Sequence, residues 1–495
     1  MSISYNQIPA GLRVPFFYAE VDNSMANLPS VNNRTILFGQ RLAAGTVAAG
    51  SIGVVPNIAQ VDQMFGAGSQ LAEMLKSYRA GDPFTELWYG CLADANTATA
   101  ASATLTITGS ALDAGALSVY LYGKRYQVGV NKGDLAAAVA TNVAAAVNAD
   151  VNCLVSAAVS AGVVTFTAKN KGSLGNDLTL RVNQRGLVGG EQTPNGLVLT
   201  LGVFGGGAVD PDAATAMTIL GDEPFEFIGY PYADAASLDA LRVEMNDISG
   251  RWAYMQQLYG HAYTAKRGTL SALSTLGRTR NDQHITCFSV SAEKPMPVFL
   301  ELAAALARTA VFINADPSRP TQTGELVGIA SAAPNKDFLW NERQVLLSSG
   351  MATTVADSGG TVRIERAVTM YQKNAYGADD VSYLDSETMH QHAYVIRRLR
   401  GVITSKYGRH KLANDGTRFA AGQATVTPSV VRGELLAEYK KLELEGHVEN
   451  YEAFAANLIV ERNANNPNRL DILFPPDMVN QLRMVGLLYQ FRLQY

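Results

Sequence analysis

The chain carries no marked excess of either charge. Its 495 residues include 40 lysines and arginines against 44 aspartates and glutamates, which gives a formal net charge of -4. Proteins that bind nucleic acid or anionic membrane surfaces concentrate positive charge on one face. We therefore expect no nucleic-acid partner and no attachment to an anionic membrane.

Cysteine and long apolar runs are also scarce. The three cysteines, Cys91, Cys153 and Cys287, lie far apart in apolar stretches, which favours buried thiols in a reducing compartment over a disulfide framework. Residues 1–7 lack the basic start and apolar core of a signal peptide, and no stretch holds about 18 uninterrupted apolar residues. We expect a protein made and folded in a cytoplasm, without direct membrane insertion.

The usual motifs of enzymes and metal sites are missing. The sequence contains no Walker-type glycine loop, Gly-x-Ser-x-Gly elbow, His-Glu-x-x-His or Cys-x-x-Cys. On a helix, His390 and His392 would point about 200° apart, too far to share an ion. The glycines at 205–207 lack the Lys-Ser/Thr ending of a phosphate loop, so we interpret them as a domain hinge. We predict no catalytic, cofactor-binding or metal site.

What is present indicates a chain of several domains that starts with an extended arm. With 47% hydrophobic residues and roughly 100–200 residues per domain, about three cores are expected. Residues 1–30 contain the alternating apolar residues Val14, Phe16 and Tyr18, interrupted by prolines, which cannot donate to a strand ladder. We predict an N-terminal arm that lies outside the core.

Short apolar strands alternate with helices on both sides of a stretch of different composition. Strands are expected at 35–39, 86–90 and 225–229, and a helix that Ser237 caps is expected to reach Trp252. This alternation is typical of layered α/β domains. We predict a split α/β core formed by residues 31–96 and 206–332.

The stretch between the two halves of this core, residues 97–205, is rich in Ala, Val, Thr and Gly and poor in charge. Gly123 is expected at the first central position of a two-residue hairpin turn, and Asp134 as the cap of a helix. Further strands are expected at 163–168, 178–182 and 197–203. We predict an inserted β-rich domain with its own core.

Residues 333–495 form the last predicted domain, which is α+β. One helix begins near Asp385, and its apolar face is expected to contain Ile396, Leu399, Ile403 and Tyr407, while three arginines lie off that face. These are Arg397, Arg398 and Arg400. A second helix is expected to begin at Pro428 after the cap Thr427 and to end near Gly446.

The chain ends on a segment with strand-like alternation, about residues 485–495. Its apolar positions include Leu487, Tyr489, Phe491 and Leu493. Such a strand needs a sheet to bury its apolar face, either in its own subunit or in a neighbouring copy. We favour donation to a neighbour, where about five ladder bonds of roughly 0.5–1.5 kcal/mol each hold two subunits together.

Several segments of the last third together resemble a known family. They are residues 366–377, Asp380, residues 383–385 and the helix that contains Arg397 and Arg400. With the order of the predicted parts along the whole chain, they are similar to the contractile tail sheath proteins of myophages, most of all those of Mu-like phages. The resemblance implies a virion structural protein rather than an enzyme.

The resemblance also implies how such a subunit works. Subunits would form hexameric rings stacked in a helical sheath around the tail tube protein, with baseplate and tail terminator proteins as further partners. Assembly would occur in the host cytoplasm, and contraction would drive the tube through the host envelope for genome ejection. The inserted domain would lie on the outside. The arms would complete sheets in neighbouring subunits by β-augmentation, and Arg397, Arg398 and Arg400 would contact the tube.

Two other classes of function remain open at this point. The α/β core is compatible with an enzyme or nucleotide-binding protein whose site lies near Gly229 or Gly205. The Ala/Thr/Gly-rich insertion suggests an extracellular lattice or adhesin protein, which the missing signal peptide disfavours.

Overall fold

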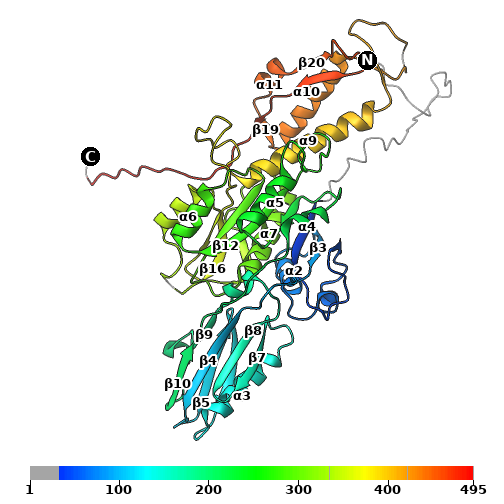
Figure 1. Ribbon diagram of the computed structural model, residues 1–495. Helices are drawn as coiled ribbons and strands as arrows, with labels where there is room; N and C mark the ends of the chain where they lie inside the picture. Colours follow the sequence, from blue (N-terminus) through cyan, green and yellow to red (C-terminus); the bar gives the residue numbers. More distant parts are fainter. Residues whose placement is uncertain (1–32, 334, 421, 494–495) are drawn as a thin grey trace, which may run out of the picture. The chain divides into compact units, whose positions relative to one another are not determined.

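The computed structural model of the protein describes residues 33–333, 335–420 and 422–493 (Figure 1). The predicted N-terminal arm, with Val14, Phe16 and Tyr18, lies outside the described residues. The described chain forms two compact units. We call Val395–Lys441 with Tyr451–Pro475 the small unit. We call Asn33–Tyr394 with Leu442–Asn450 and the chain from Pro476 onward the large unit.

A six-stranded sheet lies at the centre of the large unit. Its order is β13-β12-β11-β1-β3-β2, parallel except for the edge strand β2, which pairs antiparallel with β3. In this order the strands are β13 (Ile285–Ser291), β12 (His261–Gly268), β11 (Phe227–Gly229), β1 (Arg34–Gln40), β3 (Glu86–Leu92) and β2 (Ser51–Val54).

Strand β1 shows why this sheet is buried on both faces. Leu37 belongs to one hydrophobic cluster, with residues of α2 (Gln70–Gly81) and α7 (Val298–Ala315). Its neighbours Ile36 and Phe38 belong to a second cluster, formed with other helices of the unit. Successive side chains of a strand point to opposite faces, so a continuous apolar run is covered by helices on both sides.

The second cluster receives apolar residues from four helices, one of which is α8 (Trp340–Leu347) with Leu346. Leu238 and Leu241 belong to α5 (Ala235–Met245), and Leu273 belongs to α6 (Leu270–Arg278). Ala216 and Met217 come from the short helix α4 (Ala213–Thr218). The large unit also contains the short helix α1 (Val61–Phe65).

Among the described residues, α7 alone is long and apolar enough to cross a membrane by length and composition. Of its 18-residue window, 72% is buried inside the protein. Its Leu302 and Leu306 belong to the same cluster as Leu37. Such burial is typical of the core helix of a globular domain.

Helix α5 ends earlier than the periodicity predicts. Its cap is Asp234, whose carboxylate accepts hydrogen bonds from the backbone and hydroxyl of Ser237, so the predicted cap lies inside the helix. Asn246 ends the helix because its side-chain oxygen accepts from the amide of Ile248. Ile248 is therefore exposed, and Trp252 lies outside the helix. The prediction of a helix from Ser237 to Trp252 was wrong at both ends.

Residues 97–205 form two sheets, one α-helix and two short 3-10 helices. A four-stranded antiparallel sheet has the order β10-β4-β8-β7, and a three-stranded antiparallel sheet has the order β6-β5-β9. The elements are β4 (Ser102–Gly109), β5 (Gly115–Leu121), β6 (Lys124–Val130), α3 (Ala136–Asn148), β7 (Val155–Ser160), β8 (Val163–Ala168), β9 (Leu180–Val182) and β10 (Leu197–Leu201). Val139, Val143 and Val147 of α3 are buried, as their spacing predicts.

Two local predictions in this region were wrong by one residue. The hairpin turn has Tyr122 and Gly123 at its centre, with Leu121 paired to Lys124. Both central residues have positive φ, 42° and 84°, which is the type I′ geometry that suits the twist of a hairpin. Helix α3 is capped by Leu135 without a side-chain bond, because Asp134 accepts from the amide of Asn131 instead.

The rest of the large unit includes a three-stranded antiparallel sheet of order β14-β16-β15. Its strands are β14 (Glu325–Ala330), β16 (Thr361–Arg366) and β15 (Thr353–Ala356), and α8 (Trp340–Leu347) lies between β14 and β15 in the sequence. The long helix α9 (Ser386–Tyr407) begins in the large unit and continues into the small one. Strands β19 (Val448–Glu449) and β22 (Asp477–Met478) pair antiparallel.

The small unit is built on the helix that was predicted from Thr427 and Pro428. Helix α10 (Pro428–Leu444) begins as predicted, and its Tyr439 is fully buried. The ring of Tyr439 stacks on Phe454 of α11 (Tyr451–Asn457), with 3.7 Å between ring centroids. Two antiparallel strands, β20 (Ile459–Arg462) and β21 (Leu470–Leu473), and the short parallel pair β17 (Lys411–Leu412) and β18 (Thr425–Val426) complete the unit.

The apolar face predicted for α9 differs from the observed one. Val395 and Val402 are buried, whereas Ile396 is 39% exposed. Ion pairs of Arg398 and Lys406 with carboxylates of α10 determine which side of α9 faces that helix. Helical spacing alone does not reveal such pairs, so the prediction was wrong in the orientation of the helix.

Candidate assembly surface

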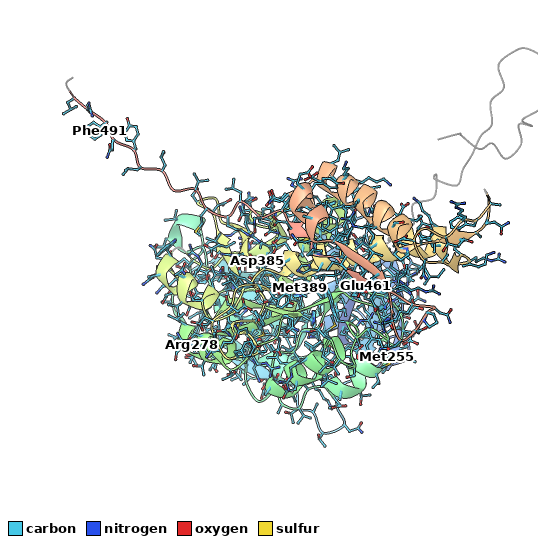
Figure 2. All side chains as sticks on the ribbon, turned by 90° about the horizontal axis from the view of Figure 1, so that it is seen from above. Met255, Arg278, Asp385, Met389, Glu461 and Phe491 are labelled. Carbon is cyan, nitrogen blue, oxygen red and sulfur yellow. The ribbon has the colours of Figure 1, made fainter. Side chains whose placement is uncertain are left out.

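The end of the chain leaves the large unit as an extended segment without secondary structure. After β22, no helix or strand is formed up to residue 493 (Figures 1 and 2). The apolar residues of the predicted terminal strand are largely exposed: Leu487 by 84%, Tyr489 by 78%, Phe491 by 67% and Leu493 by 90%. We call residues 484–493 the C-terminal arm.

The C-terminal arm has no strand partner among the described residues. Both of its faces carry exposed apolar side chains, since Leu488 is as exposed as its neighbour Leu487. The rings of Tyr489 and Phe491 lie 6.3 Å apart and contact each other rather than a core. Pairing with a strand of the described part of the subunit is thus not the arrangement observed, and donation of the arm to a neighbour stays a prediction.

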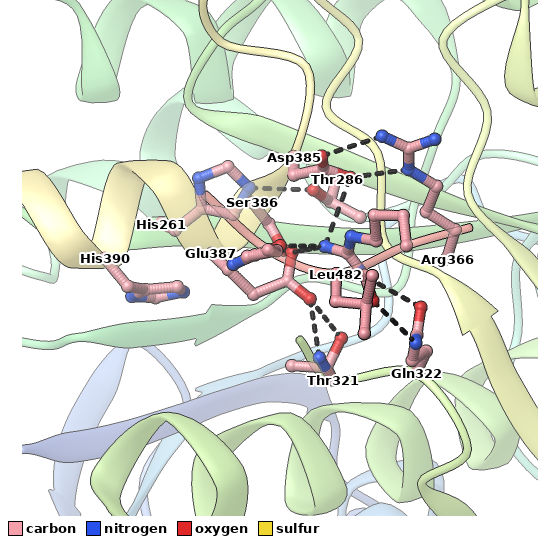
Figure 3. Close-up of polar contacts among 12 residues, drawn as sticks. His261, Thr286, Thr321, Gln322, Arg366, Asp385, Ser386, Glu387, His390 and Leu482 are labelled. Carbon is pink, nitrogen blue, oxygen red and sulfur yellow. Dashed lines mark hydrogen bonds and ion pairs between the residues drawn. The ribbon is translucent and has the colours of Figure 1, made fainter. Parts of the chain in front are cut away.

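The segment just before the arm, residues 477–483, is held on the large unit. The amide of Val479 donates to the carbonyl of His447 at 3.2 Å, and the side chain of Gln391 donates to the carbonyl of Val479 at 3.4 Å. The side-chain amide of Gln322 donates to the carbonyl of Leu482, also at 3.4 Å (Figure 3). We call residues 477–483 the arm root.

The start of α9 and the residue before it supply two carboxylates next to the arm root (Figure 3). Glu387 is fully buried, and its Oε1 accepts from the amide and the hydroxyl of Thr321, at 2.7 and 2.6 Å. Asp385 accepts two hydrogen bonds from Arg366, at 2.8 and 2.9 Å. The hydrogen bond to Asp385 raises the pKa of Arg366 further above its usual range.

Arg483, the last residue of the arm root, contacts both carboxylates. Its Nη2 lies 3.1 Å from Oε2 of Glu387 and 3.3 Å from Oδ1 of Asp385. Sequence reasoning missed this cluster, because its members lie about a hundred residues apart in the chain. The only signal was a charged residue directly before a run of apolar ones.

The two histidines at 390 and 392 have separate surroundings. His390 is buried, contacts Glu226 through Nδ1 and lies 2.7 Å from the hydroxyl of Tyr263 through Nε2. Burial raises the pKa of Tyr263 well above its ordinary value, so this hydroxyl stays protonated. His392 is half-buried against the ring of Tyr383, and burial lowers its pKa. His390 therefore connects α9 to strand β12 and to Glu226, the residue before β11, inside the large unit.

The three arginines named as possible tube contacts differ in their exposure. Arg398 is mostly buried, and its Nε donates to Glu438 of α10 at 2.5 Å. Arg397 is partly buried, and Arg400 is exposed. The structure thus places the three at different depths. Their contact with a tube stays a prediction.

Strands β20 and β21 form a hairpin with no third strand among the described residues. Ile459 is paired with Leu473, and these two residues are 50% and 57% exposed. An isolated two-stranded sheet is marginally stable in water, and its open edges can accept a further strand. We call this pair of strands the β20–β21 hairpin.

Two family models match this chain. That of the phage tail sheath protein central domain matches residues 206–370, from the glycine run to β16 and just beyond. That of the phage tail sheath C-terminal domain matches residues 378–492, which include α9, the hairpin, the arm root and most of the arm. The chain belongs to the phage tail sheath family. It is a tail sheath subunit, a structural protein and not an enzyme.

Known sheath proteins resemble this sheath subunit over its whole length. It is 39% identical over 495 residues to the tail sheath protein of a Mu-like prophage of Haemophilus influenzae, covering 99% of this chain and all of the relative. A crystal structure of a sheath tail protein from Listeria innocua matches with 13% identity and a TM-score of 0.48, covering 92% of this chain and 94% of the other. The contracted helical sheath of the anti-feeding prophage matches with 9% identity and a TM-score of 0.47, covering 98% and 100%.

Proposed function

We propose that this sheath subunit polymerises as hexameric rings, stacked in a helical sheath around a tail tube protein. Baseplate and tail terminator proteins are its further partners, and assembly takes place in the host cytoplasm. Contraction of the sheath drives the tube through the host envelope for genome ejection. The observation that carries this proposal is the C-terminal arm, which leaves large apolar side chains exposed, among them Leu487, Tyr489, Phe491 and Leu493.

The proposed subunit has the four parts expected from the sequence. An arm at 1–30 precedes a split α/β core of residues 31–96 and 206–332, and residues 97–205 form an outer inserted domain. In support, β1 to β3 share one sheet with β11 to β13, while the intervening strands form two sheets of their own. Bridges from Thr99 to Ala208 and from Ser102 to Gly205 tie the entry of this insertion to its exit. Residues 333–495 form the C-terminal domain.

The C-terminal arm is proposed to add a strand to the β20–β21 hairpin of a neighbouring subunit. The arm has exposed apolar residues without a sheet, and the hairpin is a sheet with open edges and exposed apolar residues. Burying a large apolar side chain contributes roughly 1.5–3 kcal/mol. Four such residues, together with about five ladder bonds of roughly 0.5–1.5 kcal/mol each, are comparable to the cost of ordering the arm, roughly 1–2 kcal/mol per residue.

Truncation tests strand donation directly. Deletion of residues 485–495 removes the arm after its first residue, Met484, but none of the contacts of the arm root. We expect a folded protein with an unchanged melting temperature that no longer forms cylinders in negative-stain electron microscopy. Replacing Leu487, Tyr489, Phe491 and Leu493 together with serine should have the same effect. The matched control replaces Gln490 and Arg492, on the other face of the arm, with serine. Cylinders formed by the truncated protein would contradict the proposal.

Contact with the tail tube is proposed for the arginines of α9. Arg400 is exposed on this helix, and Arg397 and Arg398 lie beside it in the sequence. Exposed arginines on a rigid helix form salt-sensitive contacts that can break and re-form. This suits a surface that has to separate from the tube during contraction.

A further inference from the structure

The arm root ends abruptly at Arg483. Its side chain is 9% exposed, whereas that of the next residue, Met484, is almost fully exposed. Every contact described above between the end of the chain and the large unit lies at or before Arg483. Arg483 is therefore the last residue bound to the large unit before the exposed arm begins.

Arg483 is held by groups from two separate parts of the large unit. Its guanidinium lies between Asp385 and Glu387, at 3.3 and 3.1 Å. The side chain of Gln322 faces the same place, because it accepts from Nη1 of Arg483 at 3.4 Å and donates to the carbonyl of Leu482. Backbone and side chain of the arm root are thus held by the same glutamine.

The charges of this cluster balance only when Arg483 is present. Arg366 and Arg483 face the carboxylates of Asp385 and Glu387. Without Arg483, Oε2 of Glu387 would keep only the hydroxyl of Ser386, at 3.4 Å. A buried carboxylate without a cation is costly, so the cluster favours the state in which the arm root is docked. The planar guanidinium reaches two carboxylates at once, which the single ammonium of a lysine does less well.

We propose that Arg483 is the positioning residue of the C-terminal arm: it fixes the point where the arm leaves the subunit and transmits the pull of a neighbouring subunit into the start of α9. This inference rests on the proposed strand donation. A pull on the arm reaches Arg483 first and passes through Asp385 and Glu387 to α9 and through Gln322 to the loop before β14. Residues from 484 onward are free to follow a neighbour, while residues 477–483 stay docked.

Hydrogen exchange of unassembled protein tests the docking. The variant Arg483→Met keeps the apolar length of the side chain and removes the charge. We expect the amide of Val479 to exchange at least tenfold faster, while amides of β12 and the melting temperature stay unchanged. A purely structural role would instead lower the melting temperature and accelerate exchange in β12 as well. The control Arg409→Met, at an exposed arginine, should leave Val479 unchanged.

Assembly separates this inference from strand donation. We expect Arg483→Met to raise the protein concentration needed for cylinder formation at least fivefold, whereas deletion of residues 485–495 abolishes cylinders. If the truncated protein still assembles, strand donation fails and this inference fails with it. If truncation abolishes assembly but Arg483→Met matches wild type in both exchange and assembly, strand donation stands and the role of Arg483 is overturned.

Two further variants keep the test valid if Arg483→Met misfolds. Arg483→Lys should give exchange at Val479 between wild type and the methionine variant, and a lysine no better than methionine would contradict a charge-based clamp. Glu387→Gln removes one partner of the same contact. Combined with Arg483→Met it should add little to the exchange rate, because both changes break the same interaction. Fully additive effects would show that the two residues act separately.

Discussion

At the scale of single residues, ion pairs between helices decide the orientation of α9. Glu438 of α10 is 1% exposed and contacts Arg398 and Lys441 at 2.5 and 3.1 Å. Burial alone would raise the pKa of Glu438, but hydrogen bonds from Arg398 and Lys441 outweigh burial and lower it. Because the pKa of Glu438 is lower in the folded than in the unfolded protein, the ionised carboxylate stabilises the folded state at pH values above the unfolded pKa, near 4.5. This contribution is lost as the pH falls through the folded pKa.

We therefore expect Glu438→Gln to destabilise the small unit by about 1.5–3 kcal/mol at pH 7. The difference from wild type should shrink once the pH falls below about 4, measured by urea denaturation at several pH values. Glu452→Gln changes an exposed carboxylate of the same unit and should cost less than about 0.5 kcal/mol. A constant difference across this pH range would contradict an ionised Glu438.

At the scale of elements, the β20–β21 hairpin is the proposed acceptor of the arm. Ile459 and Leu473 are paired and about half exposed, so their replacement by serine should barely change the melting temperature. We expect the double variant to need a several-fold higher concentration to form cylinders, because a donated strand would lose its apolar partners. The polar pair Glu461 and Asp471 of the same hairpin, also replaced by serine, is the matched control. Equal assembly of the two double variants would argue for an acceptor elsewhere.

At the scale of the whole molecule, the proposed contact with the tube can be tested separately from the proposed contact between subunits. Arg400→Glu reverses an exposed charge, whereas Arg398→Glu would place a carboxylate against Glu438 and disturb the small unit. We expect Arg400→Glu to form cylinders alone but to co-assemble poorly with purified tubes, with the defect largest at low salt. Arg409→Glu reverses another exposed arginine as a control. Normal sedimentation with tubes would exclude Arg400 from the tube contact.

Local patterns were sufficient for much of the framework. Strands β1, β3 and β8 and the start of α10 lie where sequence patterns predict them, and all three cysteines are buried free thiols as expected. Continuous apolar runs have to be covered on both faces, and a cap residue followed by proline favours the start of a helix. The alternation of apolar and polar residues in the C-terminal arm could be predicted for the same reason, because it depends on neighbouring residues alone.

Long-range contacts account for the errors. The face of α9 depends on carboxylates of α10 about 30 to 40 residues away, and the end of α5 depends on the side chain of Asn246 folding back on the next turn. The division of the chain into domains and the roles of the arms stay predictions.

The sequence by itself determined where strands such as β1, β3 and β8 and the start of α10 lie, and that the C-terminal segment has apolar residues without a core. These properties depend on side chains a few positions apart. Only the tertiary structure decided where the arm begins, because Arg483 finds its partners in Gln322, Asp385 and Glu387. Side chains about 100 to 160 residues apart leave no periodic pattern in the chain, and folding alone brings them within hydrogen-bonding distance.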